Sequence, residues 1–296
     1  MIRSTLAAAG IALLIGSPLV AQQRRDATTF TWAKQLAAGS RVSIRNVNGP
    51  ITVREAPDDR VDVRATKFVE SRGSAKDVSF DVNESGGDVE ICTIYDQQGS
   101  CRDRNRNSGR NVRVRVEYTV LIPRTMRVDL STGNGELSIV HAGADVSAST
   151  GNGRVTIGQT SGRVTVSTGN GDVRVDSANG PVNVTTGNGR VFVTTGQGEV
   201  NANTGTGAID VRMLGPLPQT SRGMTFNSGS GPIRVTLPSD FNGEIDASTG
   251  NGSLNSDFAI NVVGRLDAQH VRGTIGKGGP LLRLNTGNGT IELRKN

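Results

Sequence analysis

The pentapeptide Ser131-Thr132-Gly133-Asn134-Gly135 (STGNG) recurs along the chain at a fixed spacing. It returns as STGNG at 149–153 and 167–171 and as TTGNG at 185–189, so its central glycine recurs in equal steps of eighteen, at Gly133, Gly151, Gly169, Gly187 and Gly205. Weaker glycine-containing segments lie midway, at residues 141–144, 160–162, 177–180 and 195–198. The unit is therefore nine residues long, and a strong turn alternates with a weak one.

Each unit also carries two apolar residues separated by one polar residue. These pairs are Val155 and Ile157, Val164 and Val166, Val173 and Val175, Val182 and Val184, and Val191 and Val193. Alternation of β-branched and polar residues is typical of a strand that buries one face and exposes the other. The Gly-Asn-Gly segments supply residues that tolerate tight turns.

Two architectures fit strands and turns at this spacing. Asn-Gly between alternating apolar residues favours hairpins, and therefore an antiparallel meander. In a meander, there is no reason for turns eighteen residues apart to be more similar in sequence than turns nine residues apart. In a parallel solenoid with two units per coil, turns eighteen residues apart stack on one another, so similar turns are expected at that spacing. The charges after successive strong turns also alternate in sign, at Glu136, Arg154, Asp172 and Arg190. Strands ~4.8 Å apart would pair these charges. We predict an all-β, single-chain parallel β-solenoid of the β-roll or β-helix kind.

Calcium-binding β-rolls also use two nine-residue units per coil, but they place an aspartate two residues after the last turn glycine. That position holds valine here, at Val155, Val173 and Val191. We therefore expect no metal site and no cofactor.

The repeated turns resemble a bacterial family of adhesin-like proteins with β-strand repeats and a domain of unknown function. The later segments Leu237-Pro238-Ser239, STGNG at 248–252 and LNTGNG at 284–289 also resemble its closing segments, so the resemblance covers residues 41–294. It implies a β-repeat fold and adhesin-like binding. The family defines no functional residues to assign to this chain.

Residues 1–21 are predicted to be a signal peptide. Arg3 precedes an apolar run from Leu6 to Gly16, and cleavage after Ala21 is expected. The alternative is a buried N-terminal helix. Export would place the protein in the periplasm, at the cell surface or outside the cell, with no transmembrane anchor in the mature chain. Residues 22–40 are expected to form a linker or an N-terminal cap. Residues 41–296 are expected to form the solenoid domain, with regular repeats at about 130–213 and irregular coils at both ends.

Cys92 and Cys101 are the only cysteines. An even number of cysteines in an exported chain indicates a disulfide, here closing a ring of ten residues. The alternative is a metal-binding pair, but no other cysteine and no histidine lies nearby in the sequence.

Arginine is concentrated in one segment. Residues 102–127 carry an excess of six positive charges, equal to the net charge of the whole chain. Arginine suits two-pronged contact with carboxylate or phosphate. The candidate polyanion-binding residues are Arg102, Arg104, Arg106, Arg110, Arg113 and Arg115; the alternative is a solvated loop. Nucleic acid is not expected as a partner, because export would separate the protein from nucleic acid and few aromatic residues are available for stacking on bases.

No catalytic residues are predicted. Asp129, Asp145, Asp176 and Asp210 occupy different positions in the nine-residue unit, so no shared groove of acids is implied. We expect an exported, non-enzymatic β-solenoid with adhesin-like binding or scaffolding at the bacterial cell envelope. Its partners would be envelope glycans, anionic polymers or another envelope protein. The alternatives are a polysaccharide-active β-helix lyase or hydrolase, and a purely structural spacer.

Overall fold

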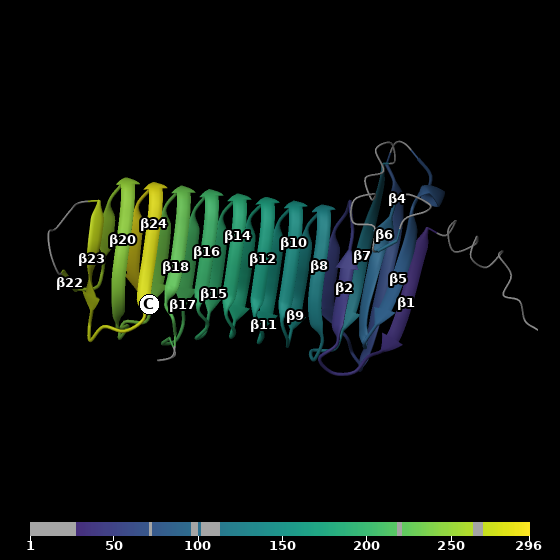
Figure 1. The fold of residues 1–296 in the computed structure, drawn as a ribbon, viewed down its shortest axis with the longest axis horizontal. Coiled ribbons are helices and arrows are strands. Elements are labelled where there is room, and N and C mark those ends of the chain that lie inside the picture. Colours follow the sequence, from purple (N-terminus) through teal and green to yellow (C-terminus); the bar gives the residue numbers. More distant parts are fainter. Residues whose placement is uncertain (1–27, 71–72, 96–99, 102–112, 218–220, 263–268) are drawn as a thin grey trace, which may run out of the picture.

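The computed structural model describes residues 28–70, 73–95, 100–101, 113–217, 221–262 and 269–296. These residues form 25 strands and one short 3-10 helix, η1 (Ala75–Asp77), arranged as two long β-sheets on either side of a narrow core (Figure 1). The signal peptide predicted at 1–21 lies outside the described residues, so it stays a prediction.

Sheet A has 12 strands within the described residues. In spatial order they are β1 (Thr29–Gln35), β4 (Arg60–Val69), β7 (Val114–Ile122), β3 (Ile51–Glu55), β9 (Leu137–Ala142), β11 (Val155–Thr160), β13 (Val173–Ala178), β15 (Val191–Thr195), β17 (Ile209–Met213), β19 (Ile233–Leu237), β25 (Ile291–Lys295) and β21 (Leu254–Ser256).

Sheet B has 13 strands in the same part of the chain. Their spatial order is β22 (Ile260–Val262), β23 (His270–Ile275), β20 (Gly243–Asn251), β24 (Leu281–Asn288), β18 (Met224–Ser230), β16 (Val200–Thr206), β14 (Val182–Asn188), β12 (Val164–Asn170), β10 (Val146–Asn152), β8 (Arg127–Asn134), β2 (Arg41–Arg45), β6 (Asp88–Ile94) and β5 (Ser79–Ser85).

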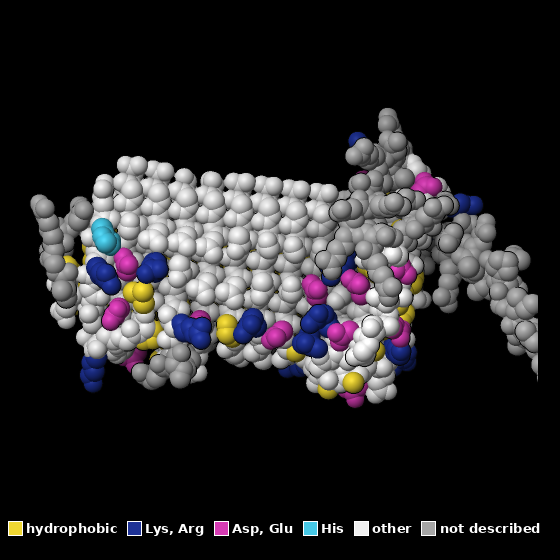
Figure 2. All heavy atoms as spheres, viewed as in Figure 1, with side chains coloured by type: hydrophobic (Ala, Val, Ile, Leu, Met, Phe, Trp, Pro, Cys, Tyr) yellow, Lys and Arg dark blue, Asp and Glu magenta, His cyan; other side chains and the backbone are white. Residues whose placement is uncertain are grey.

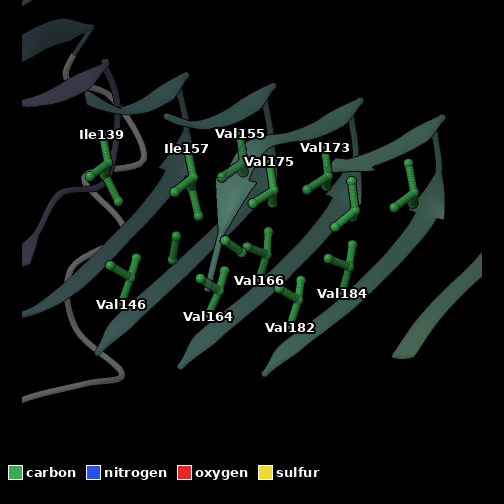
Figure 3. Packing of buried hydrophobic residues seen from close by; sticks show 14 of the residues in the cluster. Ile139, Val146, Val155, Ile157, Val164, Val166, Val173, Val175, Val182 and Val184 are labelled. Carbon is green, nitrogen blue, oxygen red and sulfur yellow. The ribbon is translucent and has the colours of Figure 1, made fainter. Parts of the chain in front are cut away.

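The predicted parallel solenoid is confirmed. In sheet A, Val173 pairs with Val155 on one side and with Val191 on the other, all in parallel strands. In sheet B, Val164 lies between Val146 and Val182 in the same way. Each step along the stack equals the spacing of the strong turns, so like residues stack. The valine side chains of the two sheets point toward one another and form the core between the sheets (Figure 3).

The strong turns stack through three kinds of contact. Each turn threonine donates its hydroxyl hydrogen bond to a glycine carbonyl of the adjacent coil, as Thr168 does to Gly153 at 3.2 Å. The turn asparagines form a ladder in which each amide nitrogen donates to the side-chain oxygen of the preceding asparagine at 2.8 Å, from Asn188 to Asn170, Asn152 and Asn134. The glycines allow this close approach, because a Cβ added at Gly187 would lie 2.5 Å from the Gly169 carbonyl oxygen.

The order of coils departs from chain order at both ends. Here a coil means one strand of sheet B followed by one strand of sheet A. The coil β2–β3 lies second in the stack, because β6–β7 packs outside it and the chain then returns to β8–β9 on its inner side. At the other end, the C-terminal coil β24–β25 lies between β18–β19 and β20–β21. The first coil, β2–β3, and the last coil, β24–β25, therefore each lie one coil in from an end of the stack.

Antiparallel strands and aromatic side chains cover the two ends. At the N-terminal end β1 and β4 extend sheet A and β5 extends sheet B, all antiparallel to their neighbours. Phe30 of β1 stacks on Phe80 of β5, with ring centroids 4.6 Å apart. At the C-terminal end β23 and β22 are antiparallel, and Phe241 and Phe258 lie over the core. These caps protect core residues and strand edges that an open solenoid would expose.

Candidate functional site

The predicted arginine cluster is only partly placed. Arg102, Arg104, Arg106 and Arg110 lie outside the described residues. Arg113 is exposed just before β7. Arg115 is paired with Glu117 and lies 3.4 Å from Glu70, and its guanidinium lies over the Phe68 ring. Arg115 therefore already has two carboxylate partners. Polyanion binding by the cluster stays a prediction.

Cys92 and Cys101 form a disulfide. Cys92 points to the outer side of sheet B, where it would be exposed if nothing covered it. Instead Cys92, Ile94 and Cys101 form a small buried cluster, and the Cys101 backbone N–H donates to Asp81. The disulfide therefore holds residue 101 against the outer side of sheet B next to β5.

The four acids considered for catalysis are spread over both sheets, and each contacts an arginine. Asp129 lies 3.7 Å from Arg45, and Asp145 accepts a hydrogen bond from the Arg163 backbone N–H at 2.8 Å. On sheet A, Asp176 pairs with Arg174 at 2.6 Å and Asp210 with Arg234 at 3.6 Å. Asp129 and Asp145 line one surface pocket of about 320 Å³ together with three arginines, whereas Asp176 and Asp210 lie on the other sheet.

The outer face of sheet B carries an extended uncharged surface, which we call the hydroxyl-amide face. It comprises the outward side chains of β10, β12, β14, β16 and β18: Ser147, Ser149, Thr165, Ser167, Asn183, Thr185, Asn201, Asn203, Thr225 and Asn227. None is charged, and Figure 2 shows this face as a continuous white area. Asn227 donates to Asn203 at 2.7 Å and Asn201 to Asn183 at 3.3 Å, so part of the surface is held by its own hydrogen bonds.

Charged residues border this face along the side where the strands of sheet B begin (Figure 2). Asp145 and Arg163 belong to this border, together with Arg41, Asp88 and Arg127 near the N-terminal end.

The alternation of charge sign predicted after the strong turns is present in one clear ion pair, between Arg190 and Asp172 at 2.9 Å. Hydrogen bonds from the Arg190 backbone and side chain hold the pKa of Asp172 below its usual range.

A small polar cavity, which we call the corner cavity, lies where the strands of sheet A end and the weak turns begin. Its volume is about 190 Å³, and Arg124, His141, Gln159, Thr160, Ser161 and Asn179 line it. Arg124 binds Glu55 through two hydrogen bonds of 2.6 and 2.9 Å, and this contact lowers the pKa of Glu55. The sequence patterns gave no indication that Arg124 or His141 would line a cavity.

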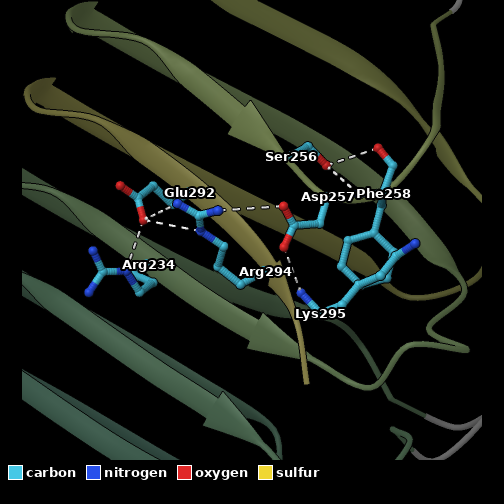
Figure 4. Close-up of polar contacts among 7 residues, drawn as sticks. All are labelled: Arg234, Ser256, Asp257, Phe258, Glu292, Arg294 and Lys295. Carbon is cyan, nitrogen blue, oxygen red and sulfur yellow. Dashed lines mark hydrogen bonds and ion pairs between the residues drawn. The ribbon is translucent and has the colours of Figure 1, made fainter.

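The C-terminal coil carries a ladder of ion pairs on sheet A (Figure 4). Arg234 of β19 lies between Asp210 of β17 and Glu292 of β25, at 3.6 and 2.9 Å. Arg294 continues the ladder from Glu292 to Asp257 at 3.3 and 3.5 Å. The hydrogen bond from Arg234 lowers the pKa of Glu292. This ladder joins residues far apart in sequence and connects the last coil to its neighbours.

Among the described residues, no helix is long and apolar enough to cross a membrane.

Comparisons with known proteins place the chain in a family. No curated protein matches it. Its similarity to solved structures is distant. A candidate cell adhesion protein from Clostridium sporogenes is 10% identical with a TM-score of 0.25, and the match covers 90% of this chain and 100% of that chain. The match to a candidate adhesin from Bacteroides fragilis has 11% identity, a TM-score of 0.27 and coverages of 90% and 96%, and that to a candidate lipid binding protein from Parabacteroides distasonis has 9% identity, a TM-score of 0.25 and coverages of 90% and 96%. The resemblance noted in the turns is confirmed, because residues 39–294 match the family described as Toastrack DUF4097, and the chain belongs to that family.

Proposed function

We propose that this protein is an exported, non-enzymatic binding protein of the bacterial cell envelope, and that it acts in an adhesin-like or scaffolding role by holding a neutral polymer against the hydroxyl-amide face. The observation that carries this proposal is that ten outward side chains on five adjacent parallel strands are all serine, threonine or asparagine. None of these ten side chains is charged, although the chain has 60 charged residues.

The chemistry of the face favours a neutral, hydroxyl-rich polymer. Hydroxyl and amide groups both donate and accept hydrogen bonds, so they can pair with sugar hydroxyl and N-acetyl groups in several orientations. The strands repeat every ~4.8 Å along the stack, so a long ligand can make the same contact many times. Single contacts of this kind are weak, and many of them along one polymer give useful affinity.

Two features support an extracytoplasmic location. Residues 1–21 have the charge and apolar pattern of a signal peptide. The disulfide between Cys92 and Cys101 is typical of proteins from oxidising compartments. A non-enzymatic role is supported by the arginine contacts of the repeat's acids, because Asp129, Asp176 and Asp210 each lie beside an arginine.

A polymer-binding screen tests the proposal with matched variants. The full chain is mixed with insoluble neutral envelope polysaccharide and, separately, with an acidic polysaccharide, and the bound fraction is measured. Thr165→Glu with Thr185→Glu places two charges on the hydroxyl-amide face and should abolish retention by the neutral polymer. Thr156→Glu with Thr194→Glu makes the same change on the outer side of sheet A and should leave retention intact.

Other outcomes separate the alternatives. Retention that both double variants leave unchanged would reject the hydroxyl-amide face, and no retention by any polymer would favour a structural spacer. Retention by the acidic polymer alone would point to the arginine cluster, where changing Arg102, Arg104, Arg106, Arg110, Arg113 and Arg115 to Gln should then remove it. Screening of exposed charges over ~10 Å at 0.1 M salt should weaken that acidic interaction steeply.

A further inference from the structure

Three arginines line one surface pocket near the N-terminal end of the hydroxyl-amide face, where charged side chains of both signs gather (Figure 2). We call it the border pocket. Its volume is about 320 Å³, and its charged residues are Arg41, Arg127, Arg163, Asp129 and Asp145. Arg41 begins β2, Arg127 begins β8 and Arg163 directly precedes β12. These arginines are far apart in sequence, so only the stacking of coils brings them to one pocket.

Arg41 and Arg127 interrupt the alternation of charge sign along the border. They are direct partners in neighbouring parallel strands. Like charges at directly opposite positions of a sheet are destabilising. Beyond Arg127 the signs alternate, because Asp145 lies in the next coil and Arg163 in the coil after it. An anion placed beside the two neighbouring arginines would turn their repulsion into attraction.

Two of the three guanidinium groups have no partner. The backbone N–H of Arg41 donates to the side chain of Asp88 at 2.8 Å. In the same way, the backbone N–H of Arg163 donates to the side chain of Asp145 at 2.8 Å. Neither arginine side chain forms a hydrogen bond or an ion pair with the part of the chain that the structure describes. Each exposed guanidinium therefore offers all five of its N–H donors to a ligand, from a backbone that is held in place.

The other charged groups of the pocket are already engaged. Arg127 donates from Nε to the Gly39 carbonyl at 2.7 Å. Asp145 accepts a backbone N–H, and Asp129 lies 3.7 Å from Arg45, which is outside the pocket. Three arginines and two aspartates leave an excess of one positive charge. This balance favours a single anionic group over a cation, and it does not suit a dense polyanion.

We propose that the border pocket binds one oxyanion, a carboxylate or a phosphate, carried by the polymer whose neutral part lies on the hydroxyl-amide face. The planar fork of arginine matches the paired oxygens of both groups. Ser147 and Thr165 line the pocket and also belong to the face, so one ligand can contact both without a gap. The volume is near the lower end of the range of about 300–1,000 Å³ for small-molecule pockets, which suits one acidic substituent. This inference rests on the proposed function for the neutral part of the ligand.

Matched oligosaccharides test the pocket. N-acetylglucosamine tetramer is neutral, whereas a tetramer in which N-acetylglucosamine alternates with N-acetylmuramate has the same rings and adds lactyl carboxylates. A glycerol phosphate tetramer supplies phosphate instead. In isothermal titration calorimetry of the full chain, at least one acidic oligomer should bind about tenfold or more tightly than the neutral tetramer, because hydrogen bonds to charged groups are the stronger ones. The tighter acidic oligomer identifies the source of the oxyanion. Equal affinities for all three would overturn the inference.

Arg41→Gln with Arg163→Gln removes both unpartnered guanidinium groups and should abolish the tenfold gain. Its melting temperature should equal or exceed that of wild type, because the repulsion between Arg41 and Arg127 is removed. If Arg41→Gln nevertheless lowers the melting temperature, Arg163→Gln alone leaves β2 unaltered and should still lose part of the gain.

The matched control is Arg54→Gln with Arg64→Gln, which removes the same charge from exposed positions on the outer side of sheet A at the same end of the stack. It should keep the gain for the acidic oligomer. Equal losses in the two double variants would overturn the inference, because a general effect of net charge would then explain binding. A gain that survives Arg41→Gln with Arg163→Gln but is lost in the variant of six arginines described above would assign the anion to the arginine cluster instead.

The two proposals fail in different ways. If neutral polymer is retained and responds to the face variants, but the gain for acidic oligomers is absent or survives Arg41→Gln with Arg163→Gln, the border pocket is rejected and the hydroxyl-amide face stands. If that variant loses the gain and neutral polymer is not retained, the face is rejected and the pocket stands as an oxyanion site. If no oligomer and no polymer binds, both proposals fall.

Discussion

The middle of the stack and its two ends are built from the same motif but follow different orders. Between β8 and β19 each coil lies beside the coil that precedes it in sequence. At each end, two coils that follow one another in sequence are separated by a third. The coil β2–β3 lies between β6–β7 and β8–β9, and the coil β24–β25 lies between β18–β19 and β20–β21. A motif that stacks equally well on every copy of itself stabilises neighbours in any order. The order at the ends must therefore come from residues outside the motif.

Charged residues on the outer sides of the sheets provide that discrimination. Arg234 of β19 lies opposite Glu292 of β25; if the coils followed chain order, it would lie opposite Asn255 of β21. On sheet B, Arg283 of β24 lies beside Asp246 of β20, 3.8 Å away. Opposite charges on adjacent strands contribute roughly 0.2–1 kcal/mol per pair, which is enough to favour one order when the motif favours none.

The largest effect is expected in the middle, where every coil has two neighbours that depend on it. Val173 is fully buried between Val155 and Val191. Val173→Asp places a charge in the narrow core between the two sheets, and we expect a loss of roughly 4 kcal/mol or more in the free energy of unfolding, with unfolding of adjacent coils. Urea titration followed by circular dichroism measures it. Thr165→Asp, at an exposed position on β12, should change stability by less than about 0.5 kcal/mol.

Cross-linking tests the order of coils at the C-terminal end. Thr225 of β18 pairs with Arg283 of β24, which in turn pairs with Asp246 of β20. Cysteines at 225 and 283 should form a disulfide on oxidation and stabilise the chain by roughly 2–4 kcal/mol, because neighbouring strands bring their Cα atoms within bonding range. Cysteines at 225 and 246 would form one only if the coils followed chain order. Peptide mapping by mass spectrometry distinguishes the two; a disulfide in the second variant alone would contradict the order described above.

The extent to which the sequence predicts the structure also differs between the middle of the stack and its ends. The regular recurrence of Gly133, Gly151 and Gly169 was sufficient to predict parallel strands and their register, because only stacked coils bring like turns together. The insertion of β24–β25 could not be predicted, since LNTGNG at 284–289 and STGNG at 248–252 are equivalent as stacking motifs. The corner cavity was missed for a related reason. Arg124 and His141 are separate in sequence and meet only when successive weak turns are stacked.

Strong and weak turns should respond differently to a single methyl group. An added Cβ at Gly187 would lie 2.5 Å from a backbone carbonyl oxygen of the adjacent coil, which the stack holds in place. Gly187→Ala should therefore cost about 1–3 kcal/mol, in the range of overpacked cores. At Gly196 the nearest atom is the side-chain oxygen of Asn179, at 3.0 Å, and a side chain can move away. Gly196→Ala should cost less than about 1 kcal/mol in the same denaturation experiment, and equal losses would mean that the turns are equally rigid.

The smallest effect is expected for the ion-pair ladder of the C-terminal coil. Glu292→Gln removes the charge that lies between Arg234 and Arg294, and we expect a loss of about 0.5–1 kcal/mol at neutral pH, because the arginines are about half exposed and solvent screens the pairs. Arg234 lowers the pKa of Glu292 in the folded state, so the contribution of Glu292 is present above the unfolded-state pKa of about 4.3 and is lost as the pH falls through the lowered folded-state value. The free energies of unfolding of wild type and Glu292→Gln should therefore differ at pH 7 and become equal in acid.

Glu244→Gln is the control and should show no such difference. Glu244 is an exposed residue of β20 with no ion pair in the described part of the chain. A gap between wild type and Glu292→Gln that persists at low pH would mean that Glu292 stabilises the coil by packing, and the coil order would then need another source of discrimination.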